Sequence, residues 1–522
     1  MNGKTTHRDL HAVAITALVT AFGVLMRLPM FRTVVLGTSS PKILWYDEAY
    51  AAFIAGRGFT EAVRLSGADT TPALFVALLS GWVRLFGDAA ATLAAFPFLW
   101  SVAAIPVMYL LGAELGGRRA GIIAALLVAV DPLHVVYATE VRTYSVLFFV
   151  SALSLLFLAR HARTGRLADG LGWTFSALAG FYASYTFLLL FLPQAVFAAW
   201  PTGKRLAAAK RYLPLFAALL VAGYLPQILL YRRWGDFVAV HGAPTSFFLR
   251  GFGHGDATTF LTFFSSLAFG PHAFYPATLF GGLASFVAGT AVAAGLAYAA
   301  YRARSDERAR LMAGCVFGGI LLAMAGRFIF APRYYLEFLA PAAALAAIGA
   351  VGVKRPWLVF APIACVLGIA ALAANRVPAA EAHKYYGQDF AATIAREAQP
   401  DDLVLADHFS DMLFRLYRPG NVETALFFPM DGRNVTAIDE RFRWVDYDLI
   451  SEADASTLEM LTAGRRRVWT VDYQPQSTSL QDPSGLKRRW LDEHFTLAET
   501  KAFPSGEASG TQKTLLLLYE RR

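Results

Sequence analysis

The sequence predicts a polytopic α-helical membrane protein with a small α/β domain at its C-terminal end. Three observations support this fold class. Hydrophobic residues make up 56% of the 522 residues and charged residues only 16%, whereas soluble domains carry about 25% charged residues. Apolar segments of roughly 20 residues, the length that crosses a bilayer, recur as far as residue 375. Beyond residue 376 the apolar segments are short and bounded by turn residues, as in soluble strands.

Eleven segments are predicted to be transmembrane helices, namely 10–30, 91–115, 120–138, 143–160, 170–184, 186–201, 212–231, 276–300, 310–330, 334–352 and 357–375. The division of residues 170–201 into two helices depends only on residues 182–185, which offer the one break in this apolar stretch. The basic N-terminus also fits a signal peptide, but no small-residue cleavage site follows it, so we expect an uncleaved first helix.

The basic residues predict how these helices are oriented. They cluster at Lys4 and Arg8, Arg118 and Arg119, Arg160, Arg163 and Arg166, Lys204, Arg205, Lys210 and Arg211, Arg302, Arg304, Arg308 and Arg310, and Lys354 and Arg355. An even number of predicted helices separates successive clusters, so all can face the cytoplasm under the positive-inside rule. We therefore expect a multi-pass protein of the cytoplasmic (inner) membrane, with a cytoplasmic N-terminus and an extracytoplasmic domain at residues 376–522.

The net charge of +9 is explained by these cytoplasmic loops, so we expect membrane lipid and no nucleic acid as a partner.

Residues 1–375 form the predicted membrane domain. Its first external loop, residues 32–90, contains an apolar segment at 72–86 that is too short to span. We expect an interfacial helix there and a second one at 47–65.

The C-terminal segment predicts a helix within residues 383–402 and buried strands at 401–408, 465–473 and 514–520. It contains no Gly-rich phosphate loop, nucleophile elbow or Cys/His metal spacing. Cys315 and Cys365 both lie in apolar runs, so they are interpreted as small buried residues. No metal site is predicted from these patterns.

The first candidate site residues are Asp47 and Glu48 in the segment WYDEAY, next to Tyr46. A carboxylate near the membrane surface can accept a proton from a hydroxyl group or bind a divalent cation beside a phosphate. The alternative is that the two acids are simply solvated.

Two further ionisable groups are predicted on the same side of the membrane. Glu140 and Arg142 precede one predicted helix, and Arg333 with Tyr334 and Tyr335 precedes another. Guanidinium groups bind phosphate oxygens well. The alternatives are a local ion pair for the first group, and an aromatic belt with an extended arginine for the second. The convergence of three groups on one side favours a functional site.

These segments resemble GT-C superfamily glycosyltransferases, of the branch of protein O-mannosyltransferases and lipid A aminoarabinose transferases (bacterial glycosyltransferase family 39). The likeness is carried by WYDEAY, DTTPALFVALLSGWVRLFG, LGGRRAGIIAALLVAVDPLHVVYATEVRTYS and PRYYLEFLAPAAAL. It covers residues 10–160 and, more loosely, 330–375. The family usually has a double proline where this chain has Thr71 and Pro72. The preceding acid corresponds to Asp69, which some members use near the site.

The resemblance implies transfer of a sugar from a polyprenyl-phosphate donor to an acceptor hydroxyl outside the cytoplasmic membrane, with inversion. Asp47 would be the general base and Glu48 its support. Arg142 and Arg333 would neutralise the departing phosphate, with Glu140 orienting Arg142. Tyr334 or Tyr335 would line the donor site. A divalent cation is compatible with this scheme but not required, and no other cofactor is expected.

The acceptor is a lipid, a polysaccharide or a protein. Two alternative functions stay open at this point. A flippase or transporter for a lipid-linked sugar would show internal repeats and polar groups at mid-membrane, neither of which is found in the sequence. A ligase that transfers a whole glycan from its polyprenyl carrier differs only in the size of the donor.

Overall fold

The computed structural model describes residues 3–31, 44, 46–66, 71–200, 210–241, 261, 263–267, 279–325, 332–351, 353–355, 363–371, 387–406, 410, 414, 417, 420–427, 452–474, 482, 484–504 and 513–522. The chain forms two compact units. One contains residues 1–39 and 66–376, and the other contains residues 40–65 and 377–522. The segment that carries the acidic pair thus groups with the C-terminal residues.

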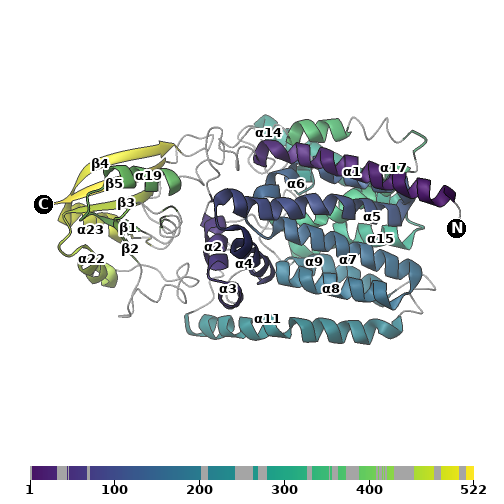
Figure 1. Ribbon diagram of the computed structural model, residues 1–522, viewed down its shortest axis with the longest axis horizontal. Coiled ribbons are helices and arrows are strands. Elements are labelled where there is room, and N and C mark those ends of the chain that lie inside the picture. The colour runs from purple at the N-terminus through teal and green to yellow at the C-terminus, as the bar shows by residue number, and fades with distance from the viewer. Residues whose placement is uncertain are drawn as a thin grey trace. The chain divides into compact units, whose positions relative to one another are not determined.

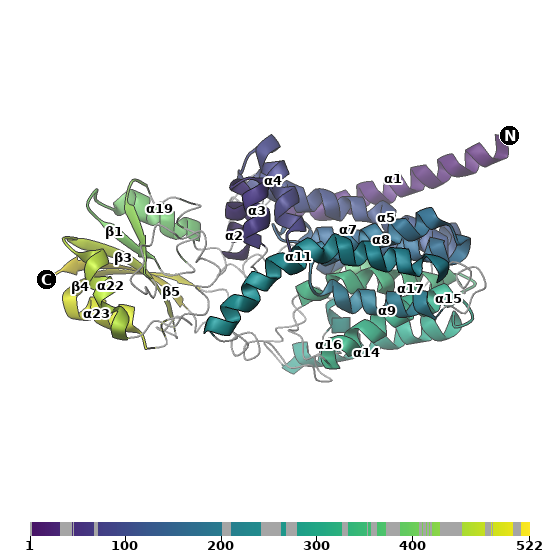
Figure 2. The same cartoon turned by 90° about the horizontal axis from the view of Figure 1, so that it is seen from below.

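The first unit is a bundle of helices. They are α1 (Gly3–Phe31), α4 (Leu74–Phe86), α5 (Ala90–Val130), α6 (Pro132–Val136), η2 (Tyr137–Thr139), α7 (Tyr144–Thr164), α8 (Leu167–Ala183), α9 (Phe187–Ala199), η3 (Lys210–Tyr212), α11 (Leu213–His241), α14 (Leu279–Arg302), α15 (Glu307–Ala313), η5 (Gly314–Gly318), α16 (Gly319–Ala325), η6 (Pro332–Phe338) and α17 (Leu339–Val351). The long helices run roughly parallel (Figure 1), and Figure 2 shows α14 beside α17.

Within the described residues, six helical segments are long and apolar enough to cross a membrane. This confirms a multi-pass helical membrane protein, although the predicted number of eleven is not confirmed. The predicted helix 91–115 and residues 120–130 of the predicted helix 120–138 lie in α5, on either side of the non-helical residues Gly116 and Gly117. The predicted helices at 170–184 and 186–201 correspond to α8 and α9, whose 17 and 13 residues are fewer than the roughly 20 that cross a bilayer. The interfacial segment predicted at 72–86 is the helix α4.

A sharp break divides α5 into two halves. Gly116 and Gly117 have non-helical backbone angles, and Gly117 has a φ of 77°, which residues with a side chain rarely adopt. The two halves then pack closely, because a Cβ atom on Gly112 would lie 2.6 Å from the carbonyl oxygen of Ala120. This break lies between the two helices that the sequence predicted here.

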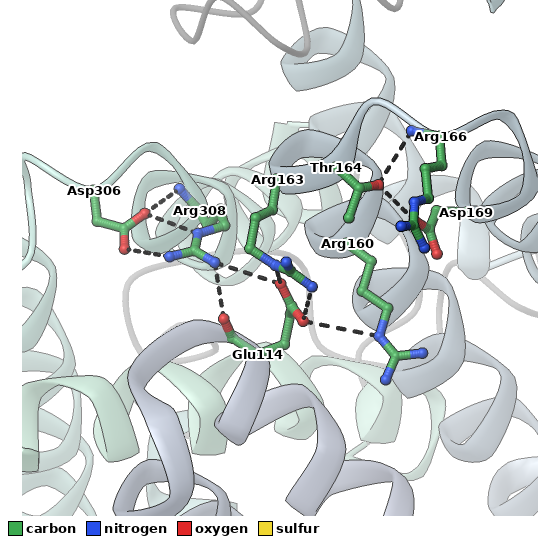
Figure 3. A network of polar contacts seen from close by, with 8 residues as sticks. All are labelled: Glu114, Arg160, Arg163, Thr164, Arg166, Asp169, Asp306 and Arg308. Carbon is green, nitrogen blue, oxygen red and sulfur yellow. Dashed lines mark hydrogen bonds and ion pairs between the residues drawn. The ribbon is translucent and has the colours of Figure 1, made fainter. Parts of the chain in front are cut away.

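Glu114 lies just before this break and joins three helices at one end of the bundle (Figure 3). It forms ion pairs with Arg163, with Arg308 at 3.5 Å and with Arg160 at 3.8 Å. Arg160 and Arg163 belong to the last turns of α7, and Arg308 to the first turn of α15. Two of the predicted basic clusters therefore meet at the same end of the bundle.

The second half of α5 ends at Val130, earlier than the predicted residue 138, because Pro132 follows. Asp131, the residue before this proline, has an extended backbone, as is typical before proline, and Pro132 lacks an N–H group, which leaves carbonyl groups at the end of α5 without helical donors. Arg27 of α1 supplies donors instead. Its Nη2 donates to the carbonyl of Val128 at 3.1 Å and its Nη1 to that of Ala129 at 2.9 Å.

Arg27 is fully buried, and its other N–H groups also have acceptors. Nε donates to the Ser101 hydroxyl at 2.8 Å, Nη1 to the carbonyl of Gly23 at 2.8 Å and Nη2 to Nδ1 of His134 at 2.6 Å. All five donors of the guanidinium group are thereby used. Asp131 caps the next turn by accepting from the His134 amide at 2.9 Å. One side chain thus joins α1 to both parts of the α5–α6 turn.

The second unit contains α2 (Tyr46–Gly56), α3 (Phe59–Ser66), α19 (Gly387–Glu397), η9 (Glu452–Asp454), α22 (Ala455–Thr462) and α23 (Leu486–His494). Its strands are β1 (Leu403–Ala406), β2 (Glu423–Leu426), β3 (Arg467–Gln474), β4 (Phe495–Pro504) and β5 (Lys513–Arg521). They form one sheet in the order β2-β1-β3-β5-β4, in which β2, β1 and β3 are parallel and β5 and β4 are antiparallel to their neighbours.

Helices cover both faces of this sheet (Figure 1). Side chains alternate between the faces along each strand, so Leu403 packs with Trp490 of α23, whereas the next residue, Val404, packs with Phe390 of α19. The predicted α/β character is confirmed, as are the helix and the three strands. Strands β2 and β4 were not predicted from the sequence.

Replacement of Arg27 by Met tests the role of the buried guanidinium group. The change keeps the length of the side chain but leaves the carbonyls of Val128 and Ala129 without donors. We expect the free energy of unfolding to fall by about 3 kcal/mol, measured as a lower midpoint of thermal unfolding in detergent. The control Thr20→Val removes a hydroxyl that bonds only within α1 and should leave the midpoint unchanged. A wild-type midpoint for Arg27→Met would contradict this role.

Candidate functional site

Two of the three predicted groups lie together in the first unit. Glu140 and Arg142 follow η2, immediately before α7, and Arg333 lies in η6, before α17. The side chain of Arg333 is within electrostatic range of Glu140. Residues that are 193 positions apart in the chain therefore meet, and they do so at the opposite end of α7 from Arg163.

Arg142 is held by contacts on both sides. Its amide donates to the carbonyl of Glu140 at 2.7 Å, which closes a tight turn. Its Nη2 donates to the hydroxyl of Thr71 at 3.2 Å. Thr71 heads the segment that leads into α4. The start of α4 and the turn that carries Arg142 are thus directly connected.

Arg333 lies over an aromatic surface. Its guanidinium carbon is 5.1 Å from the ring centroid of Tyr334. The Tyr334 ring in turn lies edge-on to that of Tyr144, with centroids 6.4 Å apart. Tyr335 is instead fully buried, and its ring stacks on the ring of Phe338, with centroids 6.0 Å apart. Of the two predicted tyrosines, Tyr334 is therefore the one beside the arginine.

Tyr144 is the residue that both arginines share, and it was not singled out from the sequence. Arg333 and Arg142 both lie within electrostatic range of it. Its ring is 5.3 Å from that of Tyr137, and its buried hydroxyl has no hydrogen-bond partner among the described residues. In the sequence, its position two residues after Arg142 is the feature that could have identified it as a site residue. Two guanidinium groups and a hydroxyl donor form a set that suits an anion with several oxygens.

The acidic pair belongs to the second unit. Asp47 and Glu48 lie in the first turn of α2, where the helix dipole stabilises negative charge. Asp47 is half-buried and Glu48 fully buried. The alternative of two solvated acids is therefore excluded for Glu48. Tyr46 is the first residue of α2, and Asp69 lies outside the described residues.

Asp47 and Glu48 are the sequence-predicted carboxylates that could hold a cation. Among the described residues, no three or more His, Cys, Asp or Glu side chains are arranged to bind a metal ion. The arginine group in the first unit is positively charged and suits an anion instead. The two groups therefore differ in charge, with carboxylates in the second unit and guanidinium groups in the first.

An apolar groove of about 610 Å³ runs along the first unit. Small residues of α14 and α17 line it, including Ala291, Gly295, Ala342 and Ala346, and Asp131 lies at its border. One of these helices, α17, belongs to a segment that is long and apolar enough to cross a membrane. A groove of this kind fits a hydrocarbon chain better than a polar ligand.

Comparisons with known proteins agree with this architecture. Residues 70–229 match the family of dolichyl-phosphate-mannose-protein mannosyltransferases. This range includes Thr71, Glu140, Arg142 and Tyr144. No curated protein matches the chain in sequence at a significant level.

Two solved structures share the fold over nearly the whole chain. ArnT from Cupriavidus metallidurans, in its apo state, is 14% identical, covers 98% of both chains and has a TM-score of 0.57. The same protein has also been solved with bound undecaprenyl phosphate, with a TM-score of 0.57.

The oligosaccharyltransferase AglB from Archaeoglobus fulgidus, in complex with an inhibitory peptide and a dolichol-phosphate, is 13% identical. The match covers 99% of this chain and 74% of that one, with a TM-score of 0.51. At this level of identity the likeness establishes the fold. The family match and the shared fold together confirm that this chain resembles the GT-C superfamily glycosyltransferases.

Proposed function

We propose that this protein is a membrane glycosyltransferase that moves a sugar from a polyprenyl-phosphate donor to an acceptor hydroxyl on the outer face of the cytoplasmic membrane. The observation that carries the proposal is the meeting of Arg142 and Arg333 around the buried hydroxyl of Tyr144. Such a group is costly to bury in an apolar bundle. Glu140 lies within electrostatic range of Arg333 and balances one of the two positive charges, and a phosphate ligand would balance the other.

In the proposed reaction, the acceptor oxygen bonds to the anomeric carbon while the bond from that carbon to the phosphate oxygen breaks. The bonding electron pair leaves with the polyprenyl phosphate. Arg142 and Arg333 stabilise the negative charge that develops on the phosphate, and the Tyr144 hydroxyl donates a further hydrogen bond. Attack from the face opposite the phosphate inverts the anomeric configuration.

Asp47 accepts the proton of the acceptor hydroxyl in this scheme. Its half-buried side chain can meet both solvent and substrate, whereas the buried Glu48 suits a supporting role. A divalent cation held by these two carboxylates would be an addition to this scheme, since the arginines already neutralise the phosphate. The apolar groove beside α17 is proposed to accommodate part of the isoprenoid chain.

The side of the membrane on which the reaction takes place is inferred from the end of the bundle where basic residues gather. The arginines around Glu114 lie at one end of α7, and Arg142 lies at the other. Because basic residues gather on the cytoplasmic side, the arginine group is assigned to the extracytoplasmic side. The oligosaccharyltransferase AglB has a similar fold, so a ligase that transfers a whole glycan is the second candidate.

Asp47→Asn tests the base directly. Purified protein in lipid nanodiscs is incubated with radiolabelled polyprenyl-phosphate monosaccharides and a membrane extract that supplies acceptors. Wild type should transfer label from one donor, and Asp47→Asn should be slower by about a hundredfold or more. The control Glu61→Gln removes a carboxylate of the same segment that pairs with Arg64 and should retain activity.

Full activity of folded Asp47→Asn would refute the assignment of the base. Transfer of label from no monosaccharide donor, together with transfer of a preassembled glycan, would favour the ligase. Movement of the donor across the membrane without transfer would indicate a flippase.

Arg142→Gln and Arg333→Gln test the phosphate site. Each variant removes one positive charge that stabilises the departing phosphate, so we expect kcat to fall by about tenfold to a thousandfold. The control Arg302→Gln changes an exposed arginine at the end of α14 and should keep the wild-type rate. Steady-state kinetics with the identified donor provide the measurement. Wild-type kcat in both site variants would contradict a role for the two arginines.

A further inference from the structure

A tyrosine of the C-terminal sheet domain contacts the segment that carries the acidic pair. The amide of Leu44 donates to the hydroxyl of Tyr417 at 2.5 Å, and the same hydroxyl lies 3.4 Å from the carbonyl oxygen of Leu44. Both residues belong to the second unit, although 373 positions separate them. One side chain therefore satisfies both backbone groups of a residue that lies three positions before Asp47.

The other side of Tyr417 is anchored in the core of the sheet domain. Tyr417 packs against the apolar cluster that lies between the sheet and α19. Phe414, which lies three positions earlier in the sequence, is a fully buried member of that cluster. Trp469 of the central strand β3 belongs to it as well. The contact with Leu44 is thus continuous with the apolar core of the unit.

The environment of Tyr417 keeps its hydroxyl group protonated. Burial raises the pKa of Tyr417, and the nearby charge of Glu48 raises it further. The hydroxyl therefore stays protonated well above neutral pH and can both accept from the Leu44 amide and donate to an oxygen. The same observation places Glu48 close to Tyr417.

We propose that Tyr417 is a positioning residue for the acidic pair, through which the C-terminal domain fixes the start of α2 and the direction in which Asp47 points. The domain then contributes to sugar transfer without touching the reacting atoms. This inference rests on the proposed function, because it supports the general base assigned there. It gives residues 376–522 a role other than acceptor binding.

The first test reads the contact without any activity measurement. Hydrogen–deuterium exchange of the full-length protein is followed by mass spectrometry on peptides that cover Leu44. Tyr417→Phe removes only the hydroxyl, so the Leu44 amide should exchange about threefold to tenfold faster. The control Tyr519→Phe removes a hydroxyl that bonds Asp492 on the other face of the sheet and should not change this exchange. An unchanged Leu44 amide in Tyr417→Phe would overturn the proposal.

The second test separates positioning from simple stabilisation. In Tyr417→Phe we expect kcat to fall by about threefold to tenfold, while KM for the donor stays within about twofold because the phosphate site is untouched. In Tyr417→Ala, kcat should fall further. Unchanged kcat despite faster exchange would refute the positioning role, as would a loss of activity that only follows a loss of folded protein. If the wild type transfers no sugar, the proposed function fails while the exchange result still reports the contact.

Discussion

The arrangement of the first unit depends on how the carbonyl groups at the end of one helix obtain hydrogen-bond donors inside the bundle. Proline at position 132 stops α5, and no water is available in an apolar bundle to accept or donate the lost hydrogen bonds. The buried guanidinium group of Arg27 takes over this role with all five of its donors. The interaction also fixes where α1 ends relative to the turn that follows α5.

The proposed site is built on that fixed turn. The chain runs from Pro132 through α6 and η2 to Glu140 and Arg142 within eleven residues. Arg142 then reaches Thr71 at the head of α4, and Arg333 approaches from η6. Polar groups therefore concentrate at the two ends of the bundle. One end holds the ion pairs around Glu114, which are internal to the protein, and the other holds two arginines that suit an external anion.

Much of this could be predicted from the sequence, because apolar segment length and the distribution of basic residues follow directly from the membrane. The helices, the break before Arg118 and the grouping of Arg142 with Arg333 are examples. Contacts made by single side chains over long separations could not be predicted. Arg27 and Tyr144 were not singled out from the sequence, because their roles depend on partners more than 70 positions away.

In the C-terminal unit too, local patterns could be predicted from the sequence and long-range contacts could not. Short apolar runs bounded by turn residues predicted β1, β3 and β5, whereas the mostly exposed residues of β4 gave no such run. The pairing of Tyr417 with Leu44 has no local signal, because it joins a domain at one end of the chain to a loop near the other. Motif order indicated that the acidic segment matters, but only the fold shows which part of the protein holds it.

Direct binding of polyprenyl phosphate tests the central claim most simply. Affinities of the purified protein for undecaprenyl phosphate and for the neutral alcohol undecaprenol are compared in the same detergent. Two charge-assisted contacts at about 1.5 kcal/mol each predict that the phosphate binds at least about a hundredfold more tightly. This preference should vanish when Arg142 and Arg333 are both changed to Gln. Equal affinities for the two lipids in the wild-type protein would contradict the phosphate site and the reaction built upon it.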